Sequence, residues 1–257
     1  MTEEKKKEST WGMIRSFGYA VLLALVFRSL AYEPFHIPSG SMLPTMQIGD
    51  YIFVSKTSYG YGRYSFPFGT VFDYFDGRVM EETPKRGDVI VFRLPNNTSI
   101  DYIKRIIGLP GDKIQVIDGV LHINGKAVKL ERIEDYNEKQ EDGSVKSVRR
   151  YMETLPNGVK QMVLDERPFG NIDVNDPTGF DSDNTGVYEV PAGHYFFMGD
   201  NRDNSEDSRY METGPGYVPA ENLIGRADVI FVSFNTQARF WEFWNWINHD
   251  RWVTYVN

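Results

Sequence analysis

The sequence predicts a mostly β protein in which a smaller subdomain is inserted into an antiparallel β core, after one apolar N-terminal helix. Short runs of β-branched and aromatic residues recur between turn residues through most of the chain, which predicts strands and hairpins. Strand and helix patterns show no regular alternation and no internal repeat. One charged, turn-rich stretch interrupts the strand runs, and we expect it to form the inserted subdomain.

Changes of composition predict five regions. These are a cytoplasmic N-terminus (1–15), a transmembrane anchor (16–32), the first part of the β core (33–130) with a loop insertion at about 58–84, an inserted subdomain (131–189), and the second part of the core with an aromatic-rich tail (190–257).

Composition narrows the classes of partner and chemistry. The 257 residues carry a formal net charge of -8 and a pI of about 5.1. An acidic chain without a dense Lys/Arg stripe argues against nucleic acid as a partner. The absence of cysteine excludes disulfides, a thiolate nucleophile and cysteine-ligated zinc, and it leaves the compartment open.

The N-terminal segment predicts that the rest of the chain is exported. Lysines at 5–7 precede the uncharged run SFGYAVLLALVF, which ends at Arg28. If the Arg28 side chain extends toward the membrane interface, residues 16–32 provide about 17 residues, the lower limit for a transmembrane helix. The basic residues before this stretch predict a cytoplasmic N-terminus. A cleavable secretory signal is the alternative, because an apolar run of about 12 residues precedes the small-x-small triplet Ser29-Leu30-Ala31. Both interpretations export residues 33–257.

The stretch FHIPSGSMLPTMQIGDYIFVSK, residues 35–56, predicts an exposed loop held on a strand. Its proline, glycine and serine residues favour a tight turn. Ser39 and Ser41 flank Gly40, and glycine lets backbone donors approach a reacting carbonyl closely. Because Tyr51–Lys56 alternates as a strand does, the loop is expected to present a nucleophile from a rigid support.

Further strands are predicted in chain order. They are VIVFRL (89–94), Ser99–Ile107, hairpins turned at Asp-Gly and Asn-Gly within 113–130, a short apolar piece KQMVLD (160–165), and a last long strand within VPAENLIGRADVIFVSF (218–234). The tail after this strand holds four of the five tryptophans, and the sequence favours membrane contact and packing against the core equally.

The residues around the loop argue against a Ser-His-Asp triad. No G-x-S-x-G motif surrounds Ser41, and Pro44 stands where an S-x-x-K motif would have its lysine. A lysine base is left, since Lys104 lies in an apolar strand where desolvation would lower the pKa of its amine. The spacing alone favours the alternative, a solvent-facing lysine beside Arg105.

A third polar cluster, GDNRDNSEDSR at 199–209, does not predict a calcium loop, because the glycine and the acid that such a loop needs are not at the required positions. The nearby DSDNTG has the glycine, but Ala192 stands where the acid is needed. A solvated loop tied by an Asp207–Arg209 pair is the simpler interpretation, and no metal site is predicted.

Taken together, four blocks resemble type I signal peptidases, the bacterial membrane-anchored leader peptidases that use a Ser/Lys dyad. The blocks are PSGSMLPT (38–45) with IGDYIFVSK, RGDVIVF (86–92), DYIKRIIGLPGD (101–112) and GDNRDNSEDSR (199–209), in family order after an apolar N-terminal segment.

The resemblance implies two joined antiparallel β domains, one catalytic and one inserted, and it implies a role for each matched residue. These are Ser41 as nucleophile, Lys104 as general base, Ser39 and the backbone N–H of Ser41 as oxyanion hole, Ser205 as the residue that orients the lysine amine, Asp207 and Arg209 as a supporting pair, and Phe35, Ile37 and Ile103 as walls of shallow pockets for small side chains.

The expected function is therefore a membrane-anchored serine endopeptidase that removes signal peptides from exported preproteins after small-x-small sites, without a cofactor or metal. Its expected partners are those preproteins and the lipid bilayer of the bacterial inner membrane, with the catalytic domain on the extracytoplasmic side. Two alternatives stay open. One is a specialised Ser/Lys processing protease of a secretion or conjugation system, and the other is a non-enzymatic, membrane-tethered β protein that binds exported chains.

Overall fold

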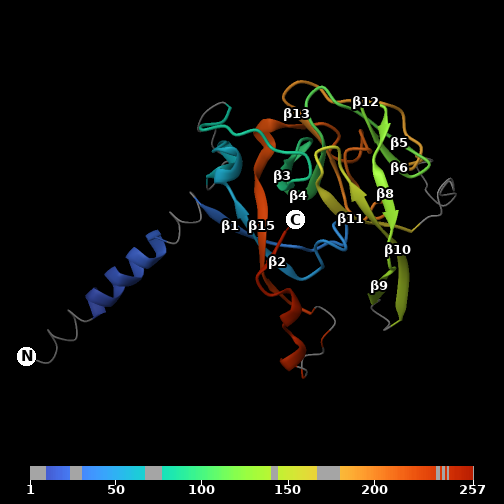
Figure 1. Ribbon diagram of the computed structural model, residues 1–257. Helices are drawn as coiled ribbons and strands as arrows, with labels where there is room; N and C mark the ends of the chain where they lie inside the picture. Colours follow the sequence, from blue (N-terminus) through green and yellow to red (C-terminus); the bar gives the residue numbers. More distant parts are fainter. Residues whose placement is uncertain are drawn as a thin grey trace, which may run out of the picture.

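The computed structural model describes residues 10–23, 31–66, 77–139, 144–166, 180–235, 238, 241 and 243–256. Within these residues the chain is mostly β, as predicted, and its strands pair antiparallel (Figure 1).

The N-terminal helix covers residues 10–23, and every side chain on it is exposed. Figure 1 shows it standing apart from the β-strands. Among the described helices, none has both the length and the apolar content needed to cross a bilayer. The anchor stays a prediction, although Ala31 lies in a turn and Tyr32, the last residue of the predicted span, opens a strand paired with Ser55. Arg28 lies outside the described residues.

An eight-stranded antiparallel sheet forms the larger part of the molecule. Its order is β1-β2-β15-β3-β4-β13-β14, and β16 also pairs with β15. The strands are β1 (Tyr32–His36), β2 (Asp50–Ser55), β3 (Val89–Leu94), β4 (Asn97–Gly108), β13 (His194–Met198), β14 (Val218–Pro219), β15 (Leu223–Ser233) and β16 (Thr254–Tyr255). The strands predicted at 51–56, 89–94 and 99–107 are confirmed to within about two residues, the usual uncertainty of a strand end, and the long strand predicted within 218–234 is present but begins only at Leu223.

Two four-stranded sheets lie beside this one. One contains β8 (Lys129–Arg132), β9 (Tyr136–Lys139), β10 (Val145–Thr154) and β11 (Lys160–Asp165), and the other contains β5 (Lys113–Ile117), β6 (Val120–Ile123), β7 (Lys126–Ala127) and β12 (Tyr188–Glu189). Short 3-10 helices η1 to η5 cover Thr57–Tyr59, Arg63–Ser65, Ala220–Asn222, Phe243–Asn245 and His249–Arg251.

The two predicted hairpins are present between β5, β6 and β7. Asp118 and Gly119 have φ of 46° and 77°, and Asn124 and Gly125 have φ of 54° and 75°. Two consecutive residues of positive φ make the type I′ turn, which Asp-Gly and Asn-Gly favour because they tolerate the left-handed region. The region boundaries at 131 and 189 stay a prediction, and β8 extends across the first of them.

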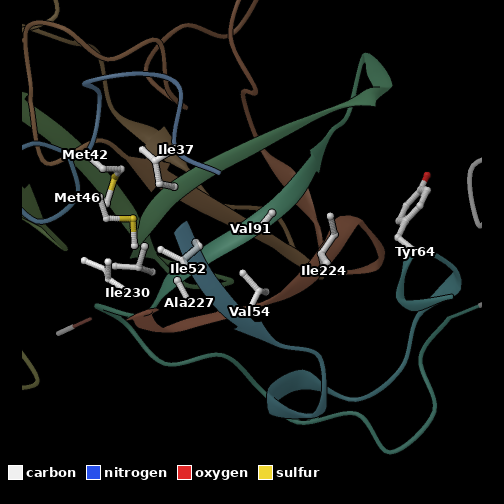
Figure 2. Close-up of a cluster of buried hydrophobic side chains, with 11 residues drawn as sticks. Ile37, Met42, Met46, Ile52, Val54, Tyr64, Val91, Ile224, Ala227 and Ile230 are labelled. Atoms are coloured by element: carbon white, nitrogen blue, oxygen red, sulfur yellow. The ribbon is translucent and has the colours of Figure 1, made fainter. Parts of the chain in front are cut away.

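The largest core cluster among the described residues joins the loop that carries Ser41 to the main sheet. Met42 and Met46, both fully buried, lie against residues of β2, β3 and β15 (Figure 2). The cluster comprises Ile37, Met42, Met46, Ile52, Val54, Tyr64, Val89, Val91, Ile224, Ala227 and Ile230. Burial of apolar side chains on either side of Ser41 therefore fixes the position of the Ser41 backbone.

Candidate active site

Ser41 lies in a compact turn between β1 and β2. The N–H of Leu43 donates to the Gly40 carbonyl at 3.1 Å, and the N–H of Met46 donates to the Met42 carbonyl at 2.9 Å. Ser41 itself is only 7% exposed. The loop is thus more enclosed than the sequence suggested, because its apolar residues are drawn into the core.

Lys104 reaches Ser41 from β4. Its Nζ atom lies 2.6 Å from Ser41 Oγ, within hydrogen-bond distance. Lys104 is 5% exposed and pairs across the sheet with Ile90 of β3. The solvent-facing alternative for this lysine is therefore wrong, since sheet pairing and the overlying segment 199–209 remove it from water.

Burial lowers the pKa of the Lys104 amine to about 8, because a charged ammonium loses hydration there. The nearby carboxylates of Asp207, Asp200 and Glu206 oppose this effect, and the Arg209 guanidinium adds to it. An amine with this pKa is neutral in a useful fraction of molecules near neutral pH, so it can accept a proton from a hydroxyl in contact with it.

The segment 199–209 packs over the Ser41–Lys104 pair. Asp207 and Arg209 form a buried ion pair within it, with Arg209 Nε 2.9 Å from Asp207 Oδ1. Burial alone would raise the pKa of Asp207, but the Arg209 guanidinium holds it below the ordinary value, so the carboxyl stays ionised. Asp207 in turn accepts the N–H of Gly199 at 3.0 Å, which fixes the fold of the segment.

Gly199 makes the close approach of this segment possible. A Cβ atom there would lie 2.2 Å from Ser205 Oγ and 2.6 Å from the Ser41 carbonyl oxygen. Both separations are shorter than any real carbon contact, so only glycine lets the backbone at 199 pass between these two residues.

Ser205 is buried, but it does not make the contact expected for it. Its Oγ atom makes no hydrogen bond of good geometry among the described residues, although its hydroxyl helps to hold the pKa of Asp207 below the ordinary value, and no hydrogen bond joins it to Lys104. Its role in orienting the amine stays a prediction.

A buried Arg105–Asp200 ion pair was missed from the sequence. Arg105 donates to Asp200 through Nε at 2.9 Å and through a terminal nitrogen at 2.7 Å, and both residues are at most 1% exposed. Asp200 also accepts the hydroxyl of Thr45 at 2.5 Å. The pair thus links β4, the loop that carries Ser41 and segment 199–209. The signal for this ion pair was the presence of two adjacent charges in the apolar run IKRII, where the sequence predicts a function only for Lys104.

A cleft of about 560 Å³ opens beside Ser41. Residues 35–39 form one wall and residues 100–104 of β4 form the other, with Val91, Asn204 and Glu206 completing it. Phe35, Ile37 and Ile103 all line it, and all three pack in or against the core cluster of Figure 2. Ser39 is exposed on the same wall. The cleft therefore has an apolar side close to the side chains of Ser41 and Lys104.

Donors for a developing negative charge are also present. Within the described residues, the backbone N–H of Ser41 makes no hydrogen bond inside the protein, while its carbonyl accepts the N–H of Asn201 at 3.1 Å. No group of three or more His, Asp or Glu side chains in the described part of the chain is arranged to hold a metal ion.

Arg251 ties the aromatic tail to the loop that carries Ser41. This residue donates to both carboxylate oxygens of Asp50, at 3.1 and 2.6 Å, and to the Thr45 carbonyl at 3.1 Å. Its neighbours Trp241, Trp244, Trp246 and Trp252 are 44 to 61% exposed. Membrane contact and packing against the core both stay predictions for the tail.

Comparison with known proteins gives consistent matches. Residues 10–232 match the family model described as signal peptidase, peptidase S26. A signal peptidase I of Rickettsia typhi is 48% identical over 88% of this chain and 81% of the relative, and one of Rickettsia rickettsii is 45% identical over 93% and 84%. A crystal structure of a signal peptidase I from Enterococcus faecalis V583 is 29% identical over 56% of this chain and 97% of that chain, with a TM-score of 0.30 that supports no argument about the fold.

Proposed function

We propose that this chain, which belongs to the signal peptidase family, peptidase S26, and is a serine endopeptidase, cleaves signal peptides with a Ser41/Lys104 dyad. The observation that carries this proposal is the 2.6 Å contact between a buried, weakly basic amine and a hydroxyl at the edge of a cleft. Family membership supports cleavage of signal peptides in general. We further propose the catalytic residues Ser41 and Lys104, cleavage after small-x-small sites, and a membrane anchor.

The chemistry follows from this contact. Neutral Lys104 takes the hydroxyl proton while Ser41 Oγ bonds to the carbonyl carbon of the scissile peptide. The carbon–nitrogen bond then breaks, the lysine ammonium returns the proton to the leaving amine, and the signal peptide stays on Ser41 as an ester. Lys104 next takes a proton from water, whose oxygen attacks the ester carbon, and the returned proton restores the Ser41 hydroxyl as the signal peptide leaves.

The oxyanion of each tetrahedral intermediate would be bound by the Ser41 backbone N–H and the Ser39 hydroxyl. The first donor is free within the described residues, and the second is exposed on the cleft wall. A donor that faces the site before the reaction needs no reorganisation when charge develops, which is why such donors lower the barrier.

Selection of small-x-small sites would come from the apolar side of the cleft. A substrate strand can lie between the backbone of residues 35–37 and that of 101–103, so that alternate side chains face the same wall. Phe35, Ile37 and Ile103 would leave only shallow space there, since they pack in or against the core. Bulky side chains at those two substrate positions would therefore be rejected.

The remaining matched residues would act as support. Asp207 and Arg209 hold segment 199–209 over the amine through their ion pair, and Ser205 would orient Lys104 once substrate is bound. Catalytic hydrogen bonds are often long or absent before the substrate arrives, so the missing hydrogen bond between Ser205 and Lys104 is compatible with this role.

Anchoring in the bacterial inner membrane is supported by the N-terminal segment. The helix at 10–23 exposes large apolar side chains, among them Trp11, Phe17, Leu22 and Leu23. Basic residues before it favour a cytoplasmic N-terminus, which would put the cleft on the extracytoplasmic side. Membrane fractionation of the full chain and N-terminal sequencing of the mature protein distinguish a retained anchor from a cleaved signal.

The decisive experiment is cleavage of a preprotein in detergent micelles by Ser41→Ala and Lys104→Ala. Each variant is expected to lose activity by about three orders of magnitude or more. Ser147→Ala and Lys126→Ala, which change exposed side chains away from the cleft, are the matched controls and should cleave normally. Processing by either dyad variant, with far-UV circular dichroism unchanged, would contradict the dyad.

A panel of unrelated preproteins separates this proposal from a specialised processing protease. Broad cleavage favours the general enzyme, and cleavage of a single substrate class favours the specialised one. The non-enzymatic alternative does not agree with membership in a family of serine endopeptidases.

A further inference from the structure

The cleft has a second face whose chemistry differs from that of the small pockets. Side chains alternate across a strand, so Tyr102 and Lys104 face away from Ile103. Consistent with this, Ile103 packs against the core cluster of Figure 2, whereas Tyr102 packs against a separate cluster with Phe92 and Phe197. A substrate strand beside β4 would meet both faces in turn.

Glu206 places a carboxylate on this second face. It lines the cleft, it is exposed, and its Oε2 accepts the hydroxyl of Tyr102 at 3.3 Å. The same tyrosine also lies near the dyad, with Lys104 Nζ 5.3 Å from the centre of the Tyr102 ring. Glu206 is therefore held near the reactive groups without being one of them.

The charge of Glu206 is not neutralised by an ion pair. The other acid that lines the cleft, Asp101, is paired with Arg93 at 3.0 Å. Within the described residues Glu206 makes no such contact, and it acts on Lys104 at a distance by raising the pKa of the amine. The second face thus presents unpaired negative charge to whatever lies beside Tyr102.

We infer that Glu206 is a specificity residue that favours a Lys or Arg side chain at the middle position of the small-x-small site and disfavours Asp or Glu there. This inference rests on the proposed function. If the two small residues face Phe35, Ile37 and Ile103, the residue between them must face the Tyr102 side, because side chains alternate. That position is the one that a small-x-small rule leaves unspecified.

The size of the effect follows from exposure. A solvent-exposed charge pair contributes about 0.2 to 1 kcal/mol, so a Lys substrate should exceed the matched Gln substrate in kcat/KM by about 1.4- to fivefold, with a similar loss for Glu. The Lys-to-Glu ratio should then be about two- to twenty-fivefold at low salt, and it should shrink at about 0.5 M salt because the charges are screened.

The test uses the full-length protein in detergent and peptides that differ only in the middle residue, which is Lys, Gln or Glu. Rates are compared at about pH 9, where Lys104 is mostly neutral, so that its titration does not enter the ratio. Glu206→Gln should bring the Lys-to-Glu ratio close to one, and Glu206→Lys should invert it. Glu212→Gln, an exposed acid outside the cleft, should keep the wild-type ratio.

The outcomes separate the two proposals. An unchanged ratio in Glu206→Gln overturns the inference, and so does charge dependence that appears only when the charged residue is moved to the first position after the cleaved bond. Neither result contradicts the proposed dyad if Ser41→Ala is still inactive on all peptides. Cleavage by Ser41→Ala would contradict the proposed function instead.

Discussion

Lys56 and Lys104 are both buried lysines of the main sheet region, yet different groups contact their amines. Lys56 is 3% exposed, and its Nζ atom lies 2.8 Å from Glu33 Oε2 and donates to the Ser65 carbonyl at 2.7 Å. Lys104 is 5% exposed and has a hydroxyl, not a carboxylate, in contact with its amine.

The difference shows that burial by itself does not make a base. An ammonium that is desolvated beside a carboxylate keeps its proton, because the opposite charge replaces the lost hydration. An ammonium that is desolvated without such a contact gives up its proton more easily, as Lys104 does with its pKa of about 8. The absence of a direct counter-charge is therefore what would fit Lys104 for the proposed proton transfer.

The largest expected effect comes from replacing each lysine by methionine. Lys104→Met should lower kcat/KM by about three orders of magnitude or more, because the base is removed. Lys56→Met should reduce activity only in proportion to the folded fraction, since Lys56 does not line the cleft. Kinetics on purified proteins, with the folded fraction measured by circular dichroism, make the comparison. Similar catalytic losses in both would contradict the division of roles.

Lys104→Met should also stabilise the fold at neutral pH. The amine has a pKa of about 8 when folded and about 10.5 when unfolded, so the unfolded chain binds the proton more tightly. The resulting loss of stability is complete below about pH 8 and disappears as the pH rises through 10.5. Thermal unfolding should therefore give a higher Tm for the variant at pH 7 and a smaller difference at about pH 10.

Removing the counter-charge of Lys56 should cost stability without changing the chemistry. Glu33→Gln leaves a buried ammonium without its carboxylate, and we expect a loss of about 2 to 3 kcal/mol in the free energy of unfolding, below the range for fully buried pairs because Glu33 is 17% exposed. Urea unfolding measures it. Glu131→Gln, which breaks the exposed pair with Lys129, should leave the urea midpoint unchanged, and an equal loss there would show that burial is not the cause.

Giving Lys104 a carboxylate should make it resemble Lys56. Tyr102→Glu places an acid beside the amine and should raise its pKa by about one unit, moving the acidic limb of the pH–rate profile from about 8 toward 9. At neutral pH the rate on a substrate without charged residues should fall about tenfold. Tyr102→Gln tests the loss of the ring alone, and an upward shift in that variant too would rule out charge as the reason.

The smallest expected effect is the reverse change. Glu206 raises the pKa of Lys104 from a distance, so Glu206→Gln should move the acidic limb downward by less than about one pH unit. Below the limb, a substrate without charged residues should then be cleaved slightly faster. A full pH–rate profile with Glu212→Gln as control measures the shift, and an upward movement would contradict the sign.

Part of the fold could be predicted because it depends on local backbone preference. The Asp118-Gly119 and Asn124-Gly125 turns follow from residues that tolerate positive φ, and β3 follows from an apolar run between turn signals. The anchor boundary could not be placed, because Tyr32 is as suitable for a membrane interface as for the edge strand β1 in which it lies. Pairing with β2, about twenty residues away, decided that strand.

For the site, the sequence by itself determined which residues belong to the family blocks, and hence the nucleophile and base to be tested. The tertiary structure decided whether they meet. Strand alternation predicts that one of Lys104 and Arg105 faces solvent, yet both are buried, because segment 199–209 covers one and Asp200 neutralises the other. Burial and counter-charge are supplied by residues almost a hundred positions away in the chain, and no local pattern in β4 specifies them.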